Sequence, residues 1–467
     1  MTQKRIGLGV FESPRPQNGN KIGWTHPMSR HQEYASLGFW CDMGRMLDDA
    51  GFDFLFFADG YGYPMTDDGY ANEISVRQGG FAGVESQMII PALAQVTRNL
   101  GLVYTTPTGL DHPIQMAKRL ATLDHFTNGR VGLNMVTGSG QDTIAQLFGH
   151  DAMRGHELRY SRMREYMDLC LNYWEGCWDD DAVIRDTGAV TYADPDKLRR
   201  IEHDGEYYRT KGYLAVEPSP QRTPLLFQAG TSQTGRAFAA KYAECVFVKS
   251  DSLSATAEAV ADIRHRAELA GRAPDDLKMF CSISITAGAT TADAQEFRRS
   301  VLAQQTDETV AAVYRNLAGI DLLALDPDRP LTQRADGASL GELNQSDVAR
   351  YLPQNGEPGP TVREILDDLK GATPSDWVIV GDGAEVADKM EHIVDTTDLD
   401  GFMLSPAIDI AELGRFVEYA LPELERRGRR DPLHGTTLRE RLFGHSRLSP
   451  THPGGAYRFV PGQTTVS

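Results

Sequence analysis

Cysteine is scarce in this sequence, with five in 467 residues. They are odd in number, scattered and never arranged as Cys-x-x-Cys. A disulfide framework or a zinc ribbon needs closely spaced pairs, so the pattern argues against both and indicates a reducing compartment. Each stands in a largely apolar stretch, as buried small side chains do. They are Cys41, Cys170, Cys177, Cys245 and Cys281.

Long apolar runs and an excess of positive charge are also missing. The mean hydropathy is −0.38, and no uncharged apolar run is long enough to span a membrane. The first apolar run ends at Glu12, which is too short for a signal peptide, so we expect a first strand there and a cytoplasmic protein. The net charge of −18 disfavours a nucleic-acid partner.

Several signatures of known chemistry are absent. There is no P-loop and no Gly-x-Ser-x-Gly elbow. Residues 156–160 (HELRY) begin like the zinc motif HExxH, but Tyr160 replaces the second histidine. Residues 138–143 (GSGQDT) lack the third glycine of a dinucleotide loop. We therefore expect no metal site and no bound nicotinamide nucleotide.

What the sequence does contain is a regular alternation of apolar runs and amphipathic stretches. Residues 52–58 (FDFLFFA) suit a strand buried on both faces. Residues 117–140 form one complete unit: a helix ending at Asn128-Gly129, a strand over 131–136 and a polar loop. About eight such units can be counted, which favours an α/β fold of the (β/α)8 TIM-barrel type with insertions over a Rossmann sheet.

The same pattern predicts a single domain over residues 1–467. No repeat of fixed period and no low-complexity linker divides the chain. Long polar or Pro/Gly-rich stretches between the units are predicted to be insertion loops, and loops of this length tend to be functional. They lie near residues 13–30, 61–83, 179–213 and 322–360.

Polar side chains follow four of the predicted strands at the point where each strand ends. The carboxyl ends of barrel strands face the active site, so these side chains are candidates for one shared ligand. The structural alternative is that such residues only end strands in turns. The candidates are Asp59, Thr105, Thr106, Asn134, Thr137, Thr231 and Ser232.

Two further features point to a binding site. Gly230-Thr231-Ser232, followed by Gly235, opens a predicted helix, and a helix start rich in small residues can seat a phosphate. The alternative is an ordinary N-cap. His156 and Tyr160 lie one turn apart on one face of a long predicted helix, so both could point into a pocket. A half-buried tyrosine near a helix start is the structural alternative.

A family resemblance enters with residues 122–138 (TLDHFTNGRVGLNMVTG). This block resembles flavin-dependent monooxygenases of the bacterial luciferase-like superfamily that oxidise nitrilotriacetate, EDTA, dibenzothiophene sulfone and long alkanes. The likeness extends over nearly the whole chain, including residues 52–59 (FDFLFFAD), 156–160 and 228–240 (QAGTSQTGRAFAA). The departures from the family pattern concern the substrate side more than the flavin side. They are Pro107, Leu133, Gly138 and Gly212-Tyr213.

The resemblance implies a TIM barrel that binds reduced FMN. Ser232 and the following helix start would hold the phosphate, and Thr106 and Asn134 would approach the isoalloxazine ring. By position, the flavin-binding residues are Asp59, Thr106, His156, Tyr160 and Ser232, to which we add the neighbours Thr105, Asn134, Thr137 and Thr231.

The resemblance also implies a two-component monooxygenase. A separate NAD(P)H:FMN reductase would supply FMNH2, and O2 would add at flavin C4a to give a peroxide that oxidises a small organic substrate. His26 or His156 could hydrogen-bond the peroxide or move a proton. A homodimer or homotetramer is the family expectation. The alternatives are a deazaflavin-dependent oxidoreductase on the same barrel and a non-catalytic flavin-binding protein. Whether a carbon, nitrogen or sulfur atom of the substrate is oxidised stays open.

Overall fold

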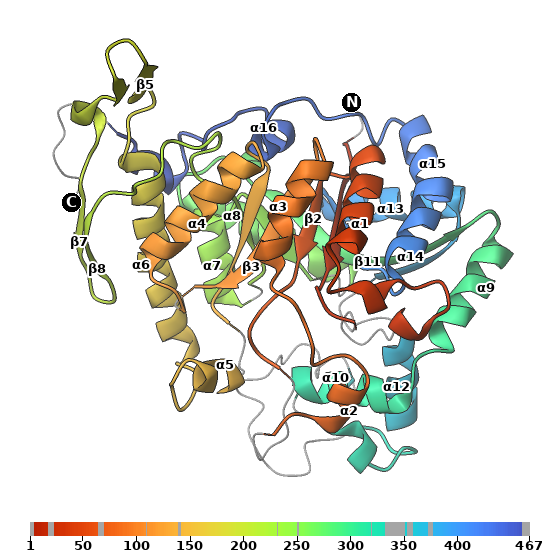
Figure 1. Ribbon diagram of the computed structural model, residues 1–467. Coiled ribbons are helices and arrows are strands. Elements are labelled where there is room, and N and C mark those ends of the chain that lie inside the picture. Colours follow the sequence, from red (N-terminus) through yellow and green to blue (C-terminus); the bar gives the residue numbers. More distant parts are fainter. Residues whose placement is uncertain are drawn as a thin grey trace.

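Eight parallel strands form a closed barrel at the centre of the molecule (Figure 1). The ring closes because β10 pairs with β11 and β13 pairs with β1. This confirms the predicted (β/α)8 barrel. The strands, in the order of the ring, are β1 (Gly7–Glu12), β2 (Phe54–Phe57), β3 (Gly101–Pro107), β4 (Val131–Val136), β9 (Leu225–Gln228), β10 (Cys245–Val248), β11 (Lys278–Gly288) and β13 (Gly401–Leu404).

This computed structural model describes most of the chain. Parts of three predicted insertion loops (17–22, 64–69, 332–350 and 353–357) lie outside the described residues. The described ranges are 4–16, 23–63, 70–108, 110–138, 142–230, 232–249, 252–318, 320–331, 351–352, 358–371 and 377–459.

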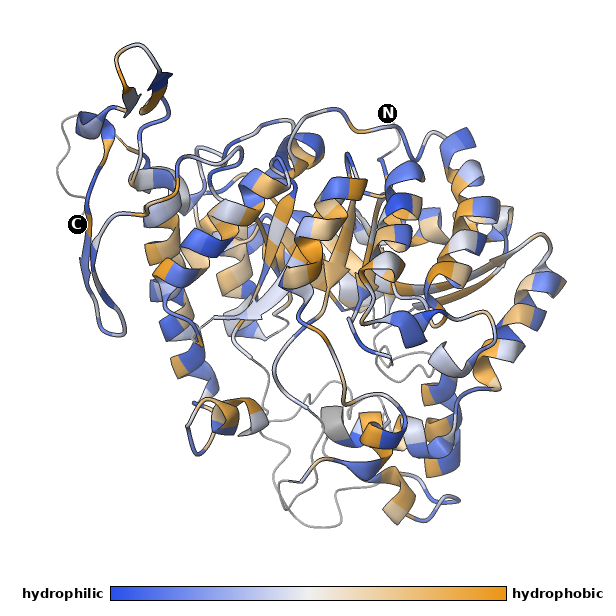
Figure 2. Ribbon diagram, viewed as in Figure 1, coloured by the Kyte–Doolittle hydropathy of each residue, from blue (hydrophilic) through white to orange (hydrophobic). Residues whose placement is uncertain are grey.

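Helices surround the barrel and turn their apolar sides toward it, as the orange faces in Figure 2 show. Within the described ranges, no helix is both long and apolar enough to cross a membrane. The surrounding helices are α1 (Leu37–Asp49), α3 (Ser86–Val96), α4 (Pro113–Phe126), α6 (His156–Gly176), α7 (Gln233–Tyr242), α8 (Leu253–Leu269), α13 (Gly383–Thr397), α14 (Asp409–Arg415) and α15 (Leu421–Arg426), with a π-helical turn (Phe416–Ala420) between the last two.

Phenylalanine fills the barrel interior. Phe54 packs edge-on against Phe227 and Phe280, with ring centroids 5.1 and 5.2 Å apart. Nearer the carboxyl ends of the strands, Phe11 stacks on Phe247 at 6.3 Å. Side chains alternate along a strand, so the intervening residues point outward to the helices. The interior is therefore a packed aromatic core, and any ligand must lie above it at the mouth.

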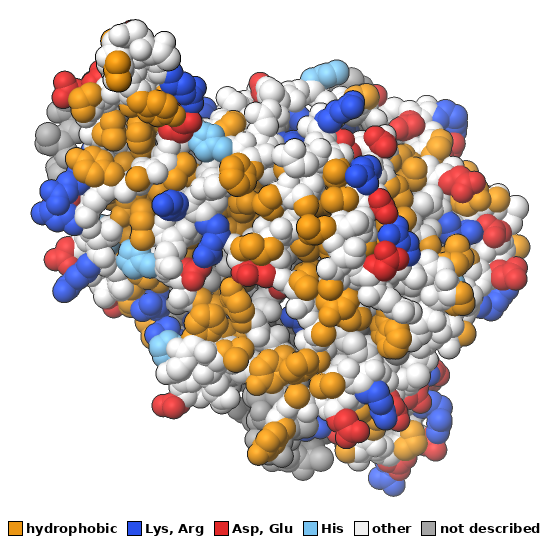
Figure 3. All heavy atoms as spheres, in the orientation of Figure 1, with side chains coloured by type: hydrophobic (Ala, Val, Ile, Leu, Met, Phe, Trp, Pro, Cys, Tyr) orange, Lys and Arg blue, Asp and Glu red, His pale blue; other side chains and the backbone are white. Residues whose placement is uncertain are grey.

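The predicted insertion at residues 179–213 contains two antiparallel hairpins rather than irregular chain. Their strands are short, and many of their side chains are exposed where the segment protrudes at the upper left of Figure 3. They therefore lack the apolar alternation by which a strand is predicted. The strands are β5 (Val183–Asp186), β6 (Thr191–Ala193), β7 (Ile201–Asp204) and β8 (Arg209–Gly212).

A second insertion separates β11 from β13 and has a small hydrophobic core of its own, which includes Tyr314 and Ile365. In Figure 1 its helices α10 and α12 lie below the barrel, next to α2, and α9 lies at the side of the barrel. It consists of α9 (Thr291–Leu302), α10 (Asp307–Ala318), α12 (Val362–Gly371) and β12 (Trp377–Asp382), and α2 spans Glu73–Arg77. The remaining helices are η1 (Gly23–Thr25), η2 (His31–Glu33), α5 (Asp142–Leu147), η3 (Pro195–Lys197), η4 (Pro274–Asp276), η5 (Leu322–Ala324), α16 (Leu438–Phe443) and η8 (Pro453–Tyr457).

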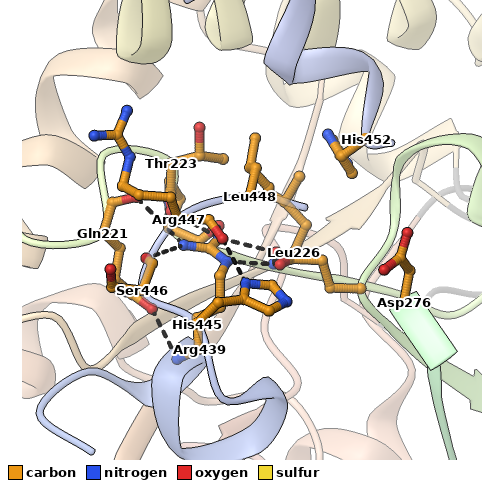
Figure 4. A network of polar contacts seen from close by, with 12 residues as sticks. Gln221, Thr223, Leu226, Asp276, Arg439, His445, Ser446, Arg447, Leu448 and His452 are labelled. Carbon is orange, nitrogen blue, oxygen red and sulfur yellow. Dashed lines mark hydrogen bonds and ion pairs between the residues drawn. The ribbon is translucent and has the colours of Figure 1, made fainter. Parts of the chain in front are cut away.

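A buried arginine fastens the C-terminal segment to the amino end of the barrel. Arg439, on α16, is fully buried and donates to both carboxylate oxygens of Glu244, at 2.6 and 2.9 Å. It also donates to the carbonyls of Gln221, Thr223 and Pro224 (Figure 4). Burial raises the pKa of Glu244 and Arg439 lowers it, and the result lies below the usual value. The pair thus ties the last helix to the starts of β9 and β10.

We predict that Arg439→Gln lowers the free energy of unfolding by about 3 kcal/mol, because it leaves the buried Glu244 carboxylate unpaired. The matched control is Arg426→Gln, whose side chain is 69% exposed and pairs with Glu423. Its loss should be much smaller, because a solvent-exposed ion pair adds little to stability. Urea unfolding of both variants measures the difference, and equal losses would contradict this role of Arg439.

His452 adds a pH-dependent contact to the same segment. Its Nε2 donates to the Tyr242 carbonyl at 2.9 Å, and its Nδ1 accepts from the Gly454 amide at 3.0 Å. Burial is the main cause that lowers the pKa of His452 to about 4, and the nearby Arg272 lowers it further. The folded protein therefore holds this ring neutral.

Acid should weaken this contact, because the unfolded chain binds a proton at His452 before the folded chain does. The contribution of His452 to the free energy of unfolding is complete above pH 6.5. It falls as the pH drops toward 4 and is smaller by about 2 kcal/mol at pH 5. His452→Asn keeps an acceptor for Gly454 and has no titrating ring. We expect its unfolding free energy to fall less than that of the unaltered protein between pH 7.5 and 5. If the unfolding free energy fell by the same amount in both proteins, this role of His452 would be contradicted.

Candidate active site

A cavity of about 310 Å³ opens at the carboxyl ends of β2 and β3. Three of the predicted site residues, Asp59, Thr105 and Thr106, line it together. Its other walls are largely aromatic or apolar. They include Tyr61, Tyr63, Phe81, Val84, Tyr104 and Pro107.

Asp59 is held rigidly at the end of β2. Its Oδ2 accepts from the amide and the hydroxyl of Ser86, at 2.8 and 2.9 Å, and its Oδ1 accepts from the Gly60 amide at 2.7 Å. Arg15 shares the cavity and donates to the Gly60 carbonyl at 3.2 Å. Burial lowers the pKa of Arg15, and the Asp59 charge opposes that shift. The carboxylate thus joins β2 to the start of α3 and faces the cavity in one orientation.

A short chain of hydrogen bonds fixes Asn134 at the end of β4. The Thr105 hydroxyl donates to the Phe57 carbonyl at 2.8 Å, and Asn134 Nδ2 donates to that hydroxyl at 3.0 Å. If the Asn134 amide were flipped, its Oδ1 would face the oxygen of the Thr105 hydroxyl, whose hydrogen already goes to Phe57. These bonds therefore favour the orientation with Nδ2 toward Thr105. Asn134 is 3% exposed, and its Oδ1 has no hydrogen-bond partner among the described residues. This oxygen is available to a ligand donor.

A second cluster forms where α6 meets α7. His156 Nε2 lies 3.2 Å from Ser232 Oγ, which caps α7 by accepting from the Gly235 amide at 3.0 Å. The Tyr160 hydroxyl lies so close to Gly230 and Gly235 that a Cβ on either glycine would stand 2.7 or 2.8 Å from it. Burial is the first cause that raises the pKa of Tyr160. The two glycines let the chain pass over this hydroxyl.

The other predicted residues are placed differently. Thr137 lines a smaller neighbouring cavity, of about 40 Å³, which shares Pro107 with the first. Thr231 lies outside the described residues. His26 is largely buried beside α9, where its Nε2 lies 3.1 Å from Ser300 Oγ and its Nδ1 accepts from the Met28 amide. His26 is not among the described residues that line either cavity.

Gln228 lies next to the second cluster, and the sequence analysis did not single it out. It ends β9, is 3% exposed, and its Oε1 has no hydrogen-bond partner among the described residues. It interacts with the Tyr160 hydroxyl. The available signal was the same as at the other strand ends, a polar residue directly after an apolar run.

The described residues contain no group of three or more His, Cys, Asp or Glu side chains that could hold a metal ion. The polar groups at the larger cavity are instead hydroxyls, amides, the carboxylates of Asp59 and Glu85 and the guanidinium of Arg15. Such a set suits an organic ligand that offers hydrogen-bond donors and acceptors.

Comparison with known proteins decides the family. The profile of the luciferase-like monooxygenases matches residues 21–399. The chain belongs to this family. This luciferase-like monooxygenase is 36% identical to the dimethyl-sulfide monooxygenase of Hyphomicrobium sulfonivorans, over 98% of this chain and 94% of that protein. It is 35% identical to the long-chain alkane monooxygenase of Geobacillus thermodenitrificans (strain NG80-2), over 98% and 99%.

Solved structures agree with the luciferase-like fold. A riboflavin lyase, crystallised with modified FMN and its substrate riboflavin, superposes with a TM-score of 0.88 at 35% identity, covering 97% of this chain and 100% of that one. The luciferase-like monooxygenase thus matches these relatives over nearly its full length.

We predict that Thr105→Val in this monooxygenase lowers the free energy of unfolding by about 1–2 kcal/mol, because the buried Asn134 amide loses its acceptor. Thr122→Val is the matched control, since its hydroxyl bonds to the Lys118 carbonyl of its own helix α4. We expect a change within about 0.5 kcal/mol for it. Equal effects in urea unfolding would show that the bond to Asn134 adds nothing.

Proposed function

We propose that this chain is the oxygenase component of a two-component system, which binds reduced FMN and uses O2 to oxidise a small organic substrate. One observation carries the proposal. Polar groups from β2, β3, β4 and β9 meet at one barrel mouth, and two of them, Asn134 Oδ1 and Gln228 Oε1, are buried amide oxygens without a described partner. Buried acceptors of this kind require a donor, and a bound ligand would supply it.

Reduced FMN fits these groups. Its ring N–H groups and ribityl hydroxyls are donors that suit the two amide oxygens. Asp59 and Thr106 would hold the ring side, because they line the larger cavity. Tyr160, His156 and Ser232 would hold the other end, where α7 begins and a helix start favours an anion. Thr105, Thr137 and Thr231 are neighbours in this assignment.

The protein's own part is to hold the reactants and exclude water. Reduced FMN, when bound, supplies the electrons that activate O2. The aromatic walls formed by Tyr61, Tyr63 and Phe81 suit a small organic molecule. His156 bonds to Ser232 and to Glu157 at 3.0 Å, which favours a holding role over proton transfer. The contacts of His26 with Met28 and Ser300 likewise favour a structural role.

The reduced flavin would come from a separate NAD(P)H:FMN reductase. The sequence lacks the third glycine of a dinucleotide loop at residues 138–143, so it offers no nicotinamide-binding fingerprint. A reductase partner supplies the missing half-reaction.

The proposal is tested by anaerobic titration of the purified protein with photoreduced FMN, followed by rapid mixing with air-saturated buffer. We expect FMNH2 to bind and the bound flavin to reoxidise with kinetics different from those of free FMNH2. The proposal would be refuted if FMNH2 did not bind, or if it consumed O2 and reoxidised at the same rate as free FMNH2. Reduced deazaflavin is the ligand to titrate in that case.

We further predict that Tyr160→Phe weakens FMNH2 binding about tenfold, because the hydroxyl under Gly230 and Gly235 is lost. The control is Tyr173→Phe on the same helix, whose hydroxyl bonds to Thr210 at 2.6 Å, away from the cavities. The control should keep the affinity of the unaltered protein. Anaerobic titrations measure both, and an unchanged affinity of Tyr160→Phe would remove Tyr160 from the assignment.

A further inference from the structure

The smaller cavity differs from the larger one in its charge. It lies between the ends of β3 and β4, helix α5 and the start of α6, which are neighbours in Figure 1. Three arginines line it, Arg154, Arg159 and Arg162, together with His150. No Asp or Glu among the described residues lines it. In a chain of net charge −18, four basic side chains around one cavity favour an anionic ligand.

Two of the three arginines, Arg159 and Arg162, are held by contacts of their side chains. Arg159 Nη1 donates to the Arg154 carbonyl at 2.5 Å. The Arg162 guanidinium lies over the rings of Tyr207 and Tyr208, 5.2 Å from each centroid. Stacking engages the face of a guanidinium, whereas its N–H groups point outward along the edge. A planar, fixed fork of this kind suits an oxyanion.

The start of α6 adds to the same field. This helix has 21 residues, and its N-cap, Gly155, has no side chain that could bond the first amides. The uncapped N–H groups carry the positive end of the helix dipole. The uncapped helix start therefore adds positive potential next to the basic side chains that line the cavity.

The larger cavity disfavours an anion. Asp59 and Glu85 both line it and outnumber Arg15. Glu85 Oε1 already accepts from the Tyr61 hydroxyl at 3.1 Å. An anionic group on a molecule bound at the mouth is therefore repelled from the larger cavity and attracted to the smaller one.

We propose that the cavity lined by Arg154, Arg159 and Arg162 is a binding site for an oxyanion: a phosphate, carboxylate or sulfonate group. This site is additional to the contacts of Tyr160 and Ser232. The oxyanion has two sources, the phosphate of the flavin and an acidic group on the organic substrate. The two share the same chemistry at the arginines.

The first test uses inorganic phosphate and needs no flavin, so it stands or fails separately from the proposed function. Isothermal titration is made with the unaltered protein, Arg154→Gln and Arg162→Gln. We expect the phosphate dissociation constant to rise about tenfold in each variant. Arg164→Gln is the matched control, because Arg164 lies on α6 but outside the cavity lining. It should bind like the unaltered protein.

The second test separates the sources. Reduced FMN, reduced riboflavin and benzenesulfonate are titrated anaerobically into the same proteins. A loss for FMN but not for riboflavin supports the site and assigns it to the flavin phosphate. A loss for benzenesulfonate alone supports the site and assigns it to the substrate. The proposal is overturned if phosphate does not bind, or if the two variants and Arg164→Gln bind every probe alike. Circular dichroism of each variant verifies folding.

Discussion

The closed barrel depends on a buried ion pair at the end opposite the candidate active site. Arg439 and Glu244 lie far apart in sequence, and both are buried. Neither charge is stable there alone, so each holds the other in place. Gln221 extends the network, because its side chain and its amide both donate to the Asp124 carboxylate on α4. The last helix, α4 and the starts of β9 and β10 are thereby fixed together. Strands β4 and β9, whose starts lie near this network, pair in a register that sets Asn134 opposite Phe227 and Met135 opposite Gln228.

Much of the barrel could be predicted from the sequence, because parallel strands buried on both faces are nearly continuous apolar runs. The strand over 131–136 has the predicted bounds, and the residues expected at the mouth include three that line one cavity. This part was predictable because all strands run the same way, so their carboxyl ends meet. The family and its fold followed from residues 122–138, and the comparisons confirm both.

Other features depend on partners that no local pattern can indicate. Arg439 stands in a charged helix that would be solvent-exposed in most proteins, and its burial follows only from Glu244. His26 is a candidate acid or base by residue type, but its partner Ser300 is 274 positions away. The arginine cavity escaped prediction for a related reason. Arg154, Arg159 and Arg162 look like an ordinary helix start until the tyrosines at 207 and 208 and the strand ends lie against them.

Strand β11 has a consequence for how molecules enter and leave. Its first half closes the barrel, and its second half, Ile283–Gly288, continues outward and pairs with β12. The insertion over the mouth is thus joined to the barrel by a hydrogen-bonded ladder as well as by its chain ends. An insertion attached in this way is poorly suited to move away from the barrel mouth during each turnover. The size of the fixed opening at the barrel mouth, and not a movement of the insertion, would then determine which molecules enter.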